Sequence, residues 1–182
     1  MNTIQNSKVK NMILVALFAA LIAVCSWISI PAAVPFTLQT MAVFLAVGLL
    51  GGKLGSLCVL IYILLGAVGL PVFSGFQGGM GALLGTTGGY ILGFLFSALL
   101  MWLMEHFLGR KAWVLIVSMI LGLAVCYAFG TVWFRTVYLA KTGPVGWMTV
   151  LSWCVFPFLI PDGIKIALAF FLTVRLQKAV NR

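Results

Sequence analysis

Charged residues are scarce in this chain, and acidic residues are the scarcest of all. Of its 182 residues only 7% are charged, and the two acids are Glu105 and Asp162. A water-soluble domain carries about 25% charged residues, so a soluble enzyme and a disordered chain are both excluded. The eleven basic residues are spread too thinly through apolar sequence to follow a nucleic-acid backbone. A composition that is 64% hydrophobic indicates an integral membrane protein whose main partner is the lipid bilayer.

The motifs of nucleotide, metal and acid–base chemistry are also missing. Gly-Gly-Lys at 51–53 is not a P-loop, because that motif needs glycine at position 47 and Ser or Thr at 54, where the chain has Val47 and Leu54. There is one histidine, His106, and the four cysteines stand singly in apolar runs. One histidine and two carboxylates supply neither a catalytic triad nor a paired-acid site. We therefore expect no enzyme activity, no metal and no cofactor.

Long uncharged runs set the expected number of helices. No residue between Lys10 and Lys53, or between Lys53 and Glu105, is charged, and each gap is long enough for two membrane crossings of about 20 residues. The runs predict an all-α bundle of six transmembrane helices. Arg135 is expected to end the fifth span, and Pro161 to open the last at a position that proline favours. The expected spans are 11–30, 37–53, 54–70, 87–107, 112–134 and 161–177, with a short helix over 147–156.

The basic residues predict the orientation of this bundle. Six crossings place most of them on one side and only Arg135 and Lys141 on the other, because Lys165 falls inside the last span. Basic loop residues favour the cytoplasm, so both termini are expected there. The residues assigned to the cytoplasmic side are Lys8, Lys10, Lys53, Arg110, Lys111, Arg175, Lys178 and Arg182. The whole chain, 1–182, is expected to be one multi-pass domain of the cell membrane.

Two ionisable residues, an acid and a base, lie near the start of the final span, and a charge at mid-membrane costs about 2.5–3.5 kcal/mol. Asp162 and Lys165 are three residues apart and therefore share one helix face. The expected topology puts them toward the outer face, as the charged part of a ligand site. A structural alternative is that Asp162 complements the helix N-terminus while Lys165 pairs with it or extends to the interface.

Other polar and aromatic groups are expected at the same outer end. An amide and a tyrosine start the second and fourth spans, and a glycine-rich loop carries a second amide. Glycine lets backbone N–H groups approach a ligand closely, and the set describes a pocket for a small molecule with a polar head and an apolar body. The alternatives are an interfacial Gln39 and a flexible loop followed by a close-packed helix, in which the small residues at 85, 89, 93 and 97 form the packing stripe. The candidate contacts are Gln39, Phe73, Gln77, Gly78, Gly79, Tyr90, Asp162 and Lys165.

Short motifs at these positions follow one another in an order that resembles a known family. The motifs are Pro-Phe-Thr-Leu-Gln-Thr at 35–40, Gly-Ala-Val-Gly-Leu-Pro-Val-Phe at 66–73, Gly-Gly at 78–79, Gly-Gly-Tyr at 88–90, Pro-Phe at 157–158 and Pro-Asp-Gly-Ile-Lys at 161–165. Each motif is short, but the ordered set is specific and covers nearly the whole chain. It resembles BioY proteins, the biotin-binding S components of energy-coupling factor (ECF) transporters.

The resemblance implies a six-helix bundle that binds biotin near its outer face. It also implies a transmembrane coupling subunit and two cytoplasmic ATPase subunits as partners, which would explain the missing P-loop. In S components an Ala-xxx-Ala stripe on the first helix contacts the coupling subunit; Ala16 and Ala20 match it, and packing inside the bundle is the alternative. Biotin's ureido ring fits an acid beside a base and its thioether ring fits aromatic walls. Its carboxylate fits Gln77 or, in the reverse pose, Lys165.

The leading hypothesis is therefore high-affinity capture of biotin at the outer face for ATP-driven import, with ATP hydrolysed by the partners. Two alternatives remain open on the sequence. One is an S component for another vitamin. The other is a solitary proton-coupled carrier of a small organic acid, in which Asp162 is the proton site.

Overall fold

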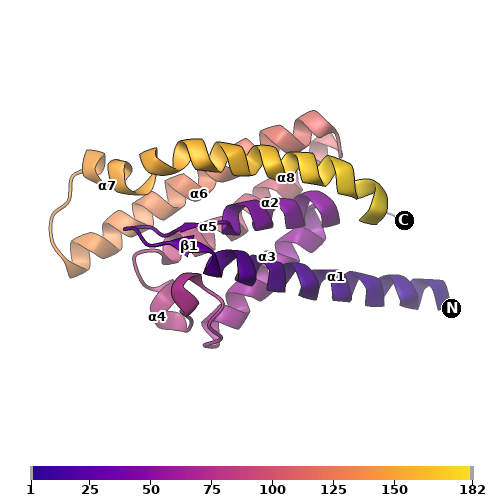
Figure 1. The fold of residues 1–182 in the computed structure, drawn as a ribbon, viewed down its shortest axis with the longest axis horizontal. Helices are drawn as coiled ribbons and strands as arrows, with labels where there is room; N and C mark the ends of the chain where they lie inside the picture. Colours follow the sequence, from indigo (N-terminus) through magenta and orange to yellow (C-terminus); the bar gives the residue numbers. More distant parts are fainter. Residues whose placement is uncertain (1, 181–182) are drawn as a thin grey trace.

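A computed structural model describes the backbone of residues 2–180 and the side chains of residues 7–177. This part of the chain forms eight α-helices and one short β-hairpin (Figure 1). The helices are α1 (Asn2–Trp27), α2 (Gln39–Leu50), α3 (Gly52–Ala67), α4 (Met80–Leu83), α5 (Gly88–Leu108), α6 (Ala112–Lys141), α7 (Trp147–Cys154) and α8 (Leu159–Val180). In the hairpin, β1 (Ser29–Ile30) pairs antiparallel with β2 (Phe36–Thr37). The expected all-α architecture is confirmed.

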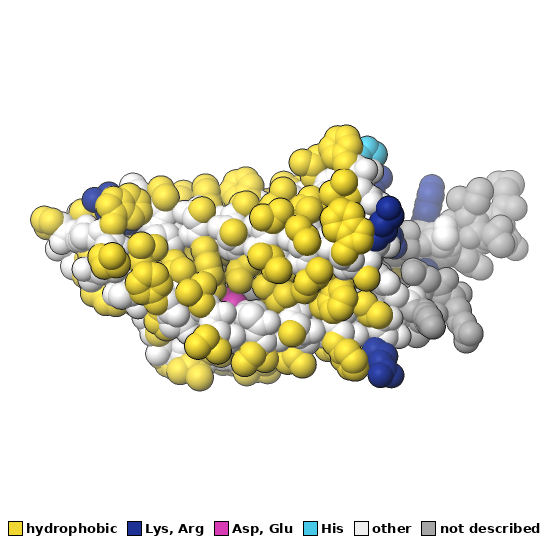
Figure 2. All heavy atoms as spheres, turned by 90° about the horizontal axis from the view of Figure 1, so that it is seen from above, with side chains coloured by type: hydrophobic (Ala, Val, Ile, Leu, Met, Phe, Trp, Pro, Cys, Tyr) yellow, Lys and Arg dark blue, Asp and Glu magenta, His cyan; other side chains and the backbone are white. Residues whose placement is uncertain are grey.

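Four helical segments of the described residues are long and apolar enough to cross a membrane. They are Ser7–Trp27, Gly88–Leu108, Ala112–Lys141 and Trp147–Gln177. α2 and α3 are apolar but have only 12 and 16 residues. At 1.5 Å per residue they measure about 18 and 24 Å, less than the hydrocarbon core of a bilayer. Hydrophobic side chains cover most of the face seen in Figure 2, as expected of a surface that contacts lipid.

α2 is the central helix of the bundle. Eleven of its 12 residues are buried, and it packs against α1, α3, α5 and α8. α2 and α8 approach each other closely at Gly48, where any larger side chain would collide with Thr173. Nearby, the side-chain amide of Gln177 donates to the Gly48 carbonyl at 3.2 Å. Packing against α2 and this hydrogen bond therefore hold α8 in position. α8 is the helix that contains Asp162 and Lys165.

A second polar contact joins two turns at the end of the bundle where both termini lie. Gly51 turns the chain between α2 and α3 with a φ of 85°. The next N–H, of Gly52, donates to Glu105 Oε2 at 2.6 Å. Arg110 Nε lies 2.6 Å from Glu105 Oε1. Glu105 therefore links the α2–α3 turn to the α5–α6 turn. One of the chain's two acids thus has a structural role, at the opposite end of the bundle from the first turn of α8.

The expected end of the fifth span is wrong, because α6 continues past residue 134 to Lys141. The expectation treated Arg135 as a boundary, since a charge usually marks the end of an apolar run. In the structure the Arg135 guanidinium lies 4.4 Å from the ring centroid of Trp147 in α7. This cation–π contact stabilises the charge while the helix continues.

Two expected helix starts are also wrong. α8 begins at Leu159, so that Pro161 stands inside its first turn. Proline fits there because the first N–H groups of a helix have no acceptor within it. α2 begins at Gln39 rather than at residue 37, because Phe36 and Thr37 pair with β1. The hairpin between α1 and α2 was not expected at all.

Candidate functional site

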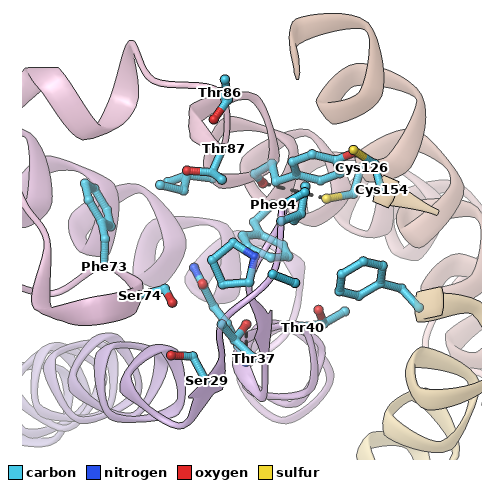
Figure 3. A pocket seen from close by; sticks show the side chains of 18 of the residues that line it. Ser29, Thr37, Thr40, Phe73, Ser74, Thr86, Thr87, Phe94, Cys126 and Cys154 are labelled. Atoms are coloured by element: carbon cyan, nitrogen blue, oxygen red, sulfur yellow. Dashed lines mark hydrogen bonds between the residues drawn. The ribbon is translucent and has the colours of Figure 1, made fainter. Parts of the chain in front are cut away.

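A cavity of about 390 Å³ is lined by the β-hairpin and the starts of α2, α5 and α8, which lie toward the end of the bundle away from the termini (Figure 1). This volume lies in the range of about 300–1,000 Å³ that small-molecule sites occupy. Its walls come from the β-hairpin, the start of α2, the loop before α4, the start of α5, the middle of α6 and the start of α8. Figure 3 shows side chains from several of these segments converging on the cavity. Most of the predicted site residues belong to these walls.

Asp162 and Lys165 form a buried ion pair in the cavity wall. Their side chains are 4% and 5% exposed, and Lys165 Nζ lies 2.7 Å from Asp162 Oδ1. The pair lies on one face of α8, as its spacing predicts. Two charges in a low-dielectric interior persist only where further hydrogen bonds satisfy them. The groups around the pair therefore decide what it can do.

Two aromatic side chains from other elements complete the surroundings of the pair. Tyr127 of α6 donates its hydroxyl proton to Asp162 Oδ2 at 2.5 Å. Lys165 Nζ lies 3.9 Å from the ring centroid of Phe36 in β2, a cation–π geometry. Each Asp162 oxygen thus has one protein donor and keeps a lone pair, and the Lys165 ammonium, with three N–H groups, has donors left. The pair can therefore accept and donate hydrogen bonds at adjacent atoms.

Predicted amides and aromatic rings also line the cavity, and three of them contact side chains outside it. The residues are Gln39, Phe73, Gln77 and Tyr90. Gln39 Nε2 donates to the hydroxyl of Tyr62 at 3.0 Å, and the Phe73 ring packs edge-on against the same tyrosine, 5.5 Å between centroids. The Tyr90 hydroxyl shares a 3.0 Å hydrogen bond with Thr131. These contacts hold the side chains of Gln39, Phe73 and Tyr90 in the cavity wall.

Gly78 and Gly79 do not belong to the cavity wall. The Gly79 N–H donates to the carbonyl of Gly66 at 2.7 Å, so this donor is occupied within the protein. A Cβ at Gly78 would collide with the carbonyl of Leu70. The structure packs these two glycines of the loop against the end of α3 and the turn that follows it, and contact between the loop and a ligand stays a prediction.

Sequence reasoning missed Tyr127 and a set of hydroxyl groups. Tyr127 stands in a long apolar run, where a tyrosine cannot be distinguished from any other core aromatic residue. Only its hydrogen bond to Asp162 on α8 shows that its hydroxyl belongs to the site. The hydroxyls come from separate segments and form no pattern in the sequence. They belong to Ser29, Thr37, Thr40, Ser74, Thr86 and Thr87, all labelled in Figure 3. The only available signal was Thr86-Thr87 directly before the Gly-Gly-Tyr motif.

Ala16 and Ala20 lie on the outer surface of α1. Both are exposed, whereas Ala19 and Ala23 are 2% and 6% exposed and belong to the core. α1 packs against α2 and α3, and the buried alanines supply that packing. Contacts inside the described bundle therefore do not explain the Ala16–Ala20 stripe, which is presented to the surroundings of the protein.

Comparisons with known proteins agree with one another. The sequence model of the BioY family matches residues 1–182. The biotin transporter BioY of Thermotoga maritima is 42% identical over 173 residues, 93% of this chain and 96% of the relative. The probable biotin transporter BioY of Pyrococcus horikoshii is 43% identical over 171 residues, 93% and 98% of the two chains. The fold is similar to a crystal structure of the S-component for biotin from an ECF-type ABC transporter, with a TM-score of 0.84, 29% identity and coverage of 98% and 95%. The chain is a multi-pass membrane protein that belongs to the BioY family.

Proposed function

We propose that this chain is the biotin-binding S component of an ATP-driven ECF importer in the prokaryotic plasma membrane. The observation that carries the proposal is the buried Asp162–Lys165 pair in the wall of a 390 Å³ cavity, in a chain whose relatives are named biotin transporters. The protein captures its ligand and is not an enzyme. Transport energy comes from partner subunits that hydrolyse ATP.

The charged pair binds the ureido ring of biotin rather than its carboxylate. A cyclic urea presents an N–H donor next to a carbonyl acceptor and has no net charge. An acceptor oxygen of Asp162 and the donor nitrogen of Lys165 lie 2.7 Å apart, which is the complementary arrangement. A carboxylate in the same place would face the negative charge of Asp162, a repulsion that low local polarity strengthens. The aromatic walls then enclose the thioether ring.

The distribution of basic residues supports six membrane helices with both termini in the cytoplasm. Lys53, Arg110 and Lys111 lie at turns on the end where the termini lie, and Arg135 and Lys141 belong to the other half of α6. Cytoplasmic loops carry the excess of Lys and Arg. α2 and α3 complete the six-helix count as short spans within the bundle. This orientation places the cavity at the outer face.

The expected result for the purified full-length chain in detergent is saturable binding of labelled biotin with a Kd below about 1 µM, a free energy near −8 kcal/mol. Unlabelled biotin should displace the label, whereas thiamine and riboflavin should not. Absence of saturable binding would refute the proposal. Saturable binding of labelled thiamine or riboflavin by a chain that does not bind labelled biotin would select an S component for that vitamin. Uptake into vesicles by this chain alone, abolished by an uncoupler, would favour the solitary carrier.

Tyr127→Phe is expected to weaken biotin binding about tenfold, because a hydrogen bond to a charged group contributes roughly 1.5–3 kcal/mol. The variant keeps the ring and removes only the donor to Asp162 Oδ2, so the carboxylate loses one of the groups that orient it. Isothermal titration calorimetry measures the change. Tyr138→Phe is the matched control, since Tyr138 lies in the same helix and its ring packs on Phe134, outside the cavity wall. Equal affinities for the wild type and Tyr127→Phe would contradict the orienting role.

A further inference from the structure

The charges of the cavity wall are concentrated at one side. Among the wall residues that the structure describes, only Asp162 and Lys165 are charged, and both are buried. Asp162 bonds to Tyr127, the neighbour of Cys126 in α6. Figure 3 shows Cys126 and Cys154 on one side of the cavity and Phe73, Ser74, Thr86 and Thr87 on the other. The ion pair therefore lies on the side of α6 and α8.

The opposite side of the cavity is neutral and more open. Its polar groups are the hydroxyls of Ser74, Thr86 and Thr87 and the amide of Gln77. Gln77 is exposed and the other three are half-buried. Hydroxyl and amide groups both donate and accept hydrogen bonds. The described residues of this side thus offer hydrogen bonding in either direction and contact with water, but no fixed positive charge.

Sites that require a carboxylate usually pair it with Arg or Lys, whose charge-assisted bonds are about twice as strong as neutral ones. No Arg or Lys stands among the described residues of the neutral side. With the ureido ring on the ion pair, the valerate tail extends to the neutral side. A carboxamide there keeps the carbonyl acceptor and replaces the anionic oxygen by an N–H donor, which the same hydroxyls can accept.

From this distribution we propose a second class of substrate, the carboxamides of biotin, in which an amine is joined to the valerate carbonyl. The class includes biotin linked to the side-chain amine of lysine, because the tail leaves the cavity on its exposed side and the added group extends into water. The proposal rests on the proposed biotin function and on the pose in which the ureido ring contacts Asp162 and Lys165.

Competition against labelled biotin on the purified full-length chain tests the proposal. The competitors are unlabelled biotin, the primary amide of biotin and Nε-biotinyl-lysine. We expect both amides to bind within tenfold of biotin. Biotin that binds tightly while both amides bind more than tenfold more weakly would overturn this inference and leave the biotin function intact. Absence of biotin binding would instead overturn the biotin function itself, and with it this inference.

A charge added to the neutral side gives an independent measurement. Gln77→Lys is expected to shift the ratio of affinities toward biotin and away from its primary amide by about tenfold, since the new ammonium pairs only with the carboxylate. Met80→Lys is the matched control, because Met80 is exposed at the start of α4 and lies outside the cavity wall; its ratio should equal that of the wild type. An unchanged ratio in Gln77→Lys would place the tail elsewhere and overturn the inference.

Discussion

Asp162→Asn is expected to lower the affinity for biotin by more than tenfold, the largest effect of any single change in the cavity wall. The asparagine keeps the shape of the side chain but cannot carry the charge that Lys165 Nζ contacts at 2.7 Å. It leaves an ammonium group with a 5% exposed side chain without its counter-charge, which costs about 3–5 kcal/mol in a buried site. The ureido ring also loses its strongest acceptor. Titration calorimetry on the purified protein measures the loss.

A double variant separates binding from stability. Asp162→Asn alone should lower the thermal unfolding temperature, because Lys165 is then buried without a counter-charge. Asp162→Asn combined with Lys165→Met removes both charges at similar volume and should recover stability, as replacement of a buried ion pair by apolar groups often does. The double variant should still fail to bind biotin with high affinity. Lys165→Ala alone should also weaken binding more than tenfold.

The other acid of the chain supplies the control. Glu105→Gln removes a carboxylate that bonds to the Gly52 N–H and to Arg110 at the opposite end of the bundle. It should leave the affinity for biotin unchanged, whatever it does to stability. Wild-type affinity in both Asp162→Asn and Lys165→Ala would show that the pair only complements the first turn of α8, the structural alternative that the sequence leaves open.

The ion pair in the wall of the candidate site could be predicted from the sequence, because charges are rare in the chain. The chain has only two acids, so an acid and a base three residues apart in the last span have few charged partners other than each other. Tyr127 could not be predicted, because its chemistry comes from a partner 35 residues away. The role of the loop glycines also depends on residues elsewhere in the chain. Glycine marks a close approach of the backbone, but the sequence does not say whether a ligand or, as for Gly78, another carbonyl makes that approach.

The helices likewise divide into features that depend on local sequence and features that depend on distant partners. Hydrophobic runs located each of the long apolar helices, since hydropathy depends on the residues of the segment itself. The predicted helix boundaries are wrong where a residue outside the segment determines where the helix starts or ends. Trp147 accommodates Arg135 and lets α6 continue, and Ser29 pairs with Thr37 and delays the start of α2. Such pairings depend on the tertiary fold, which local composition does not encode.

Tryptophan at both Ala16 and Ala20 is expected to abolish association with the coupling subunit while biotin binding stays within about threefold of the wild type. Helices in membranes associate through small residues that let their backbones approach, because lipid offers no hydrophobic gain for burial. Both alanines are exposed on α1, so indole rings there meet no side chain inside the bundle. They do prevent close approach of a second helix. Co-purification of the coupling subunit with tagged variants measures the effect.

Val132→Trp provides the matched control for these substitutions. Val132 lies on α6, is 54% exposed and faces away from the bundle as the two alanines do, but it belongs to no stripe of small residues. This variant should retain the coupling subunit. If the variant with tryptophan at both alanines also retains it in wild-type amounts, another surface must bind the partner. If instead that variant loses biotin binding, α1 must be coupled to the cavity. One route is available for that coupling, because Ser26 near the end of α1 donates to the carbonyl of Val72 at 2.5 Å, in the loop that carries Phe73 and Gln77.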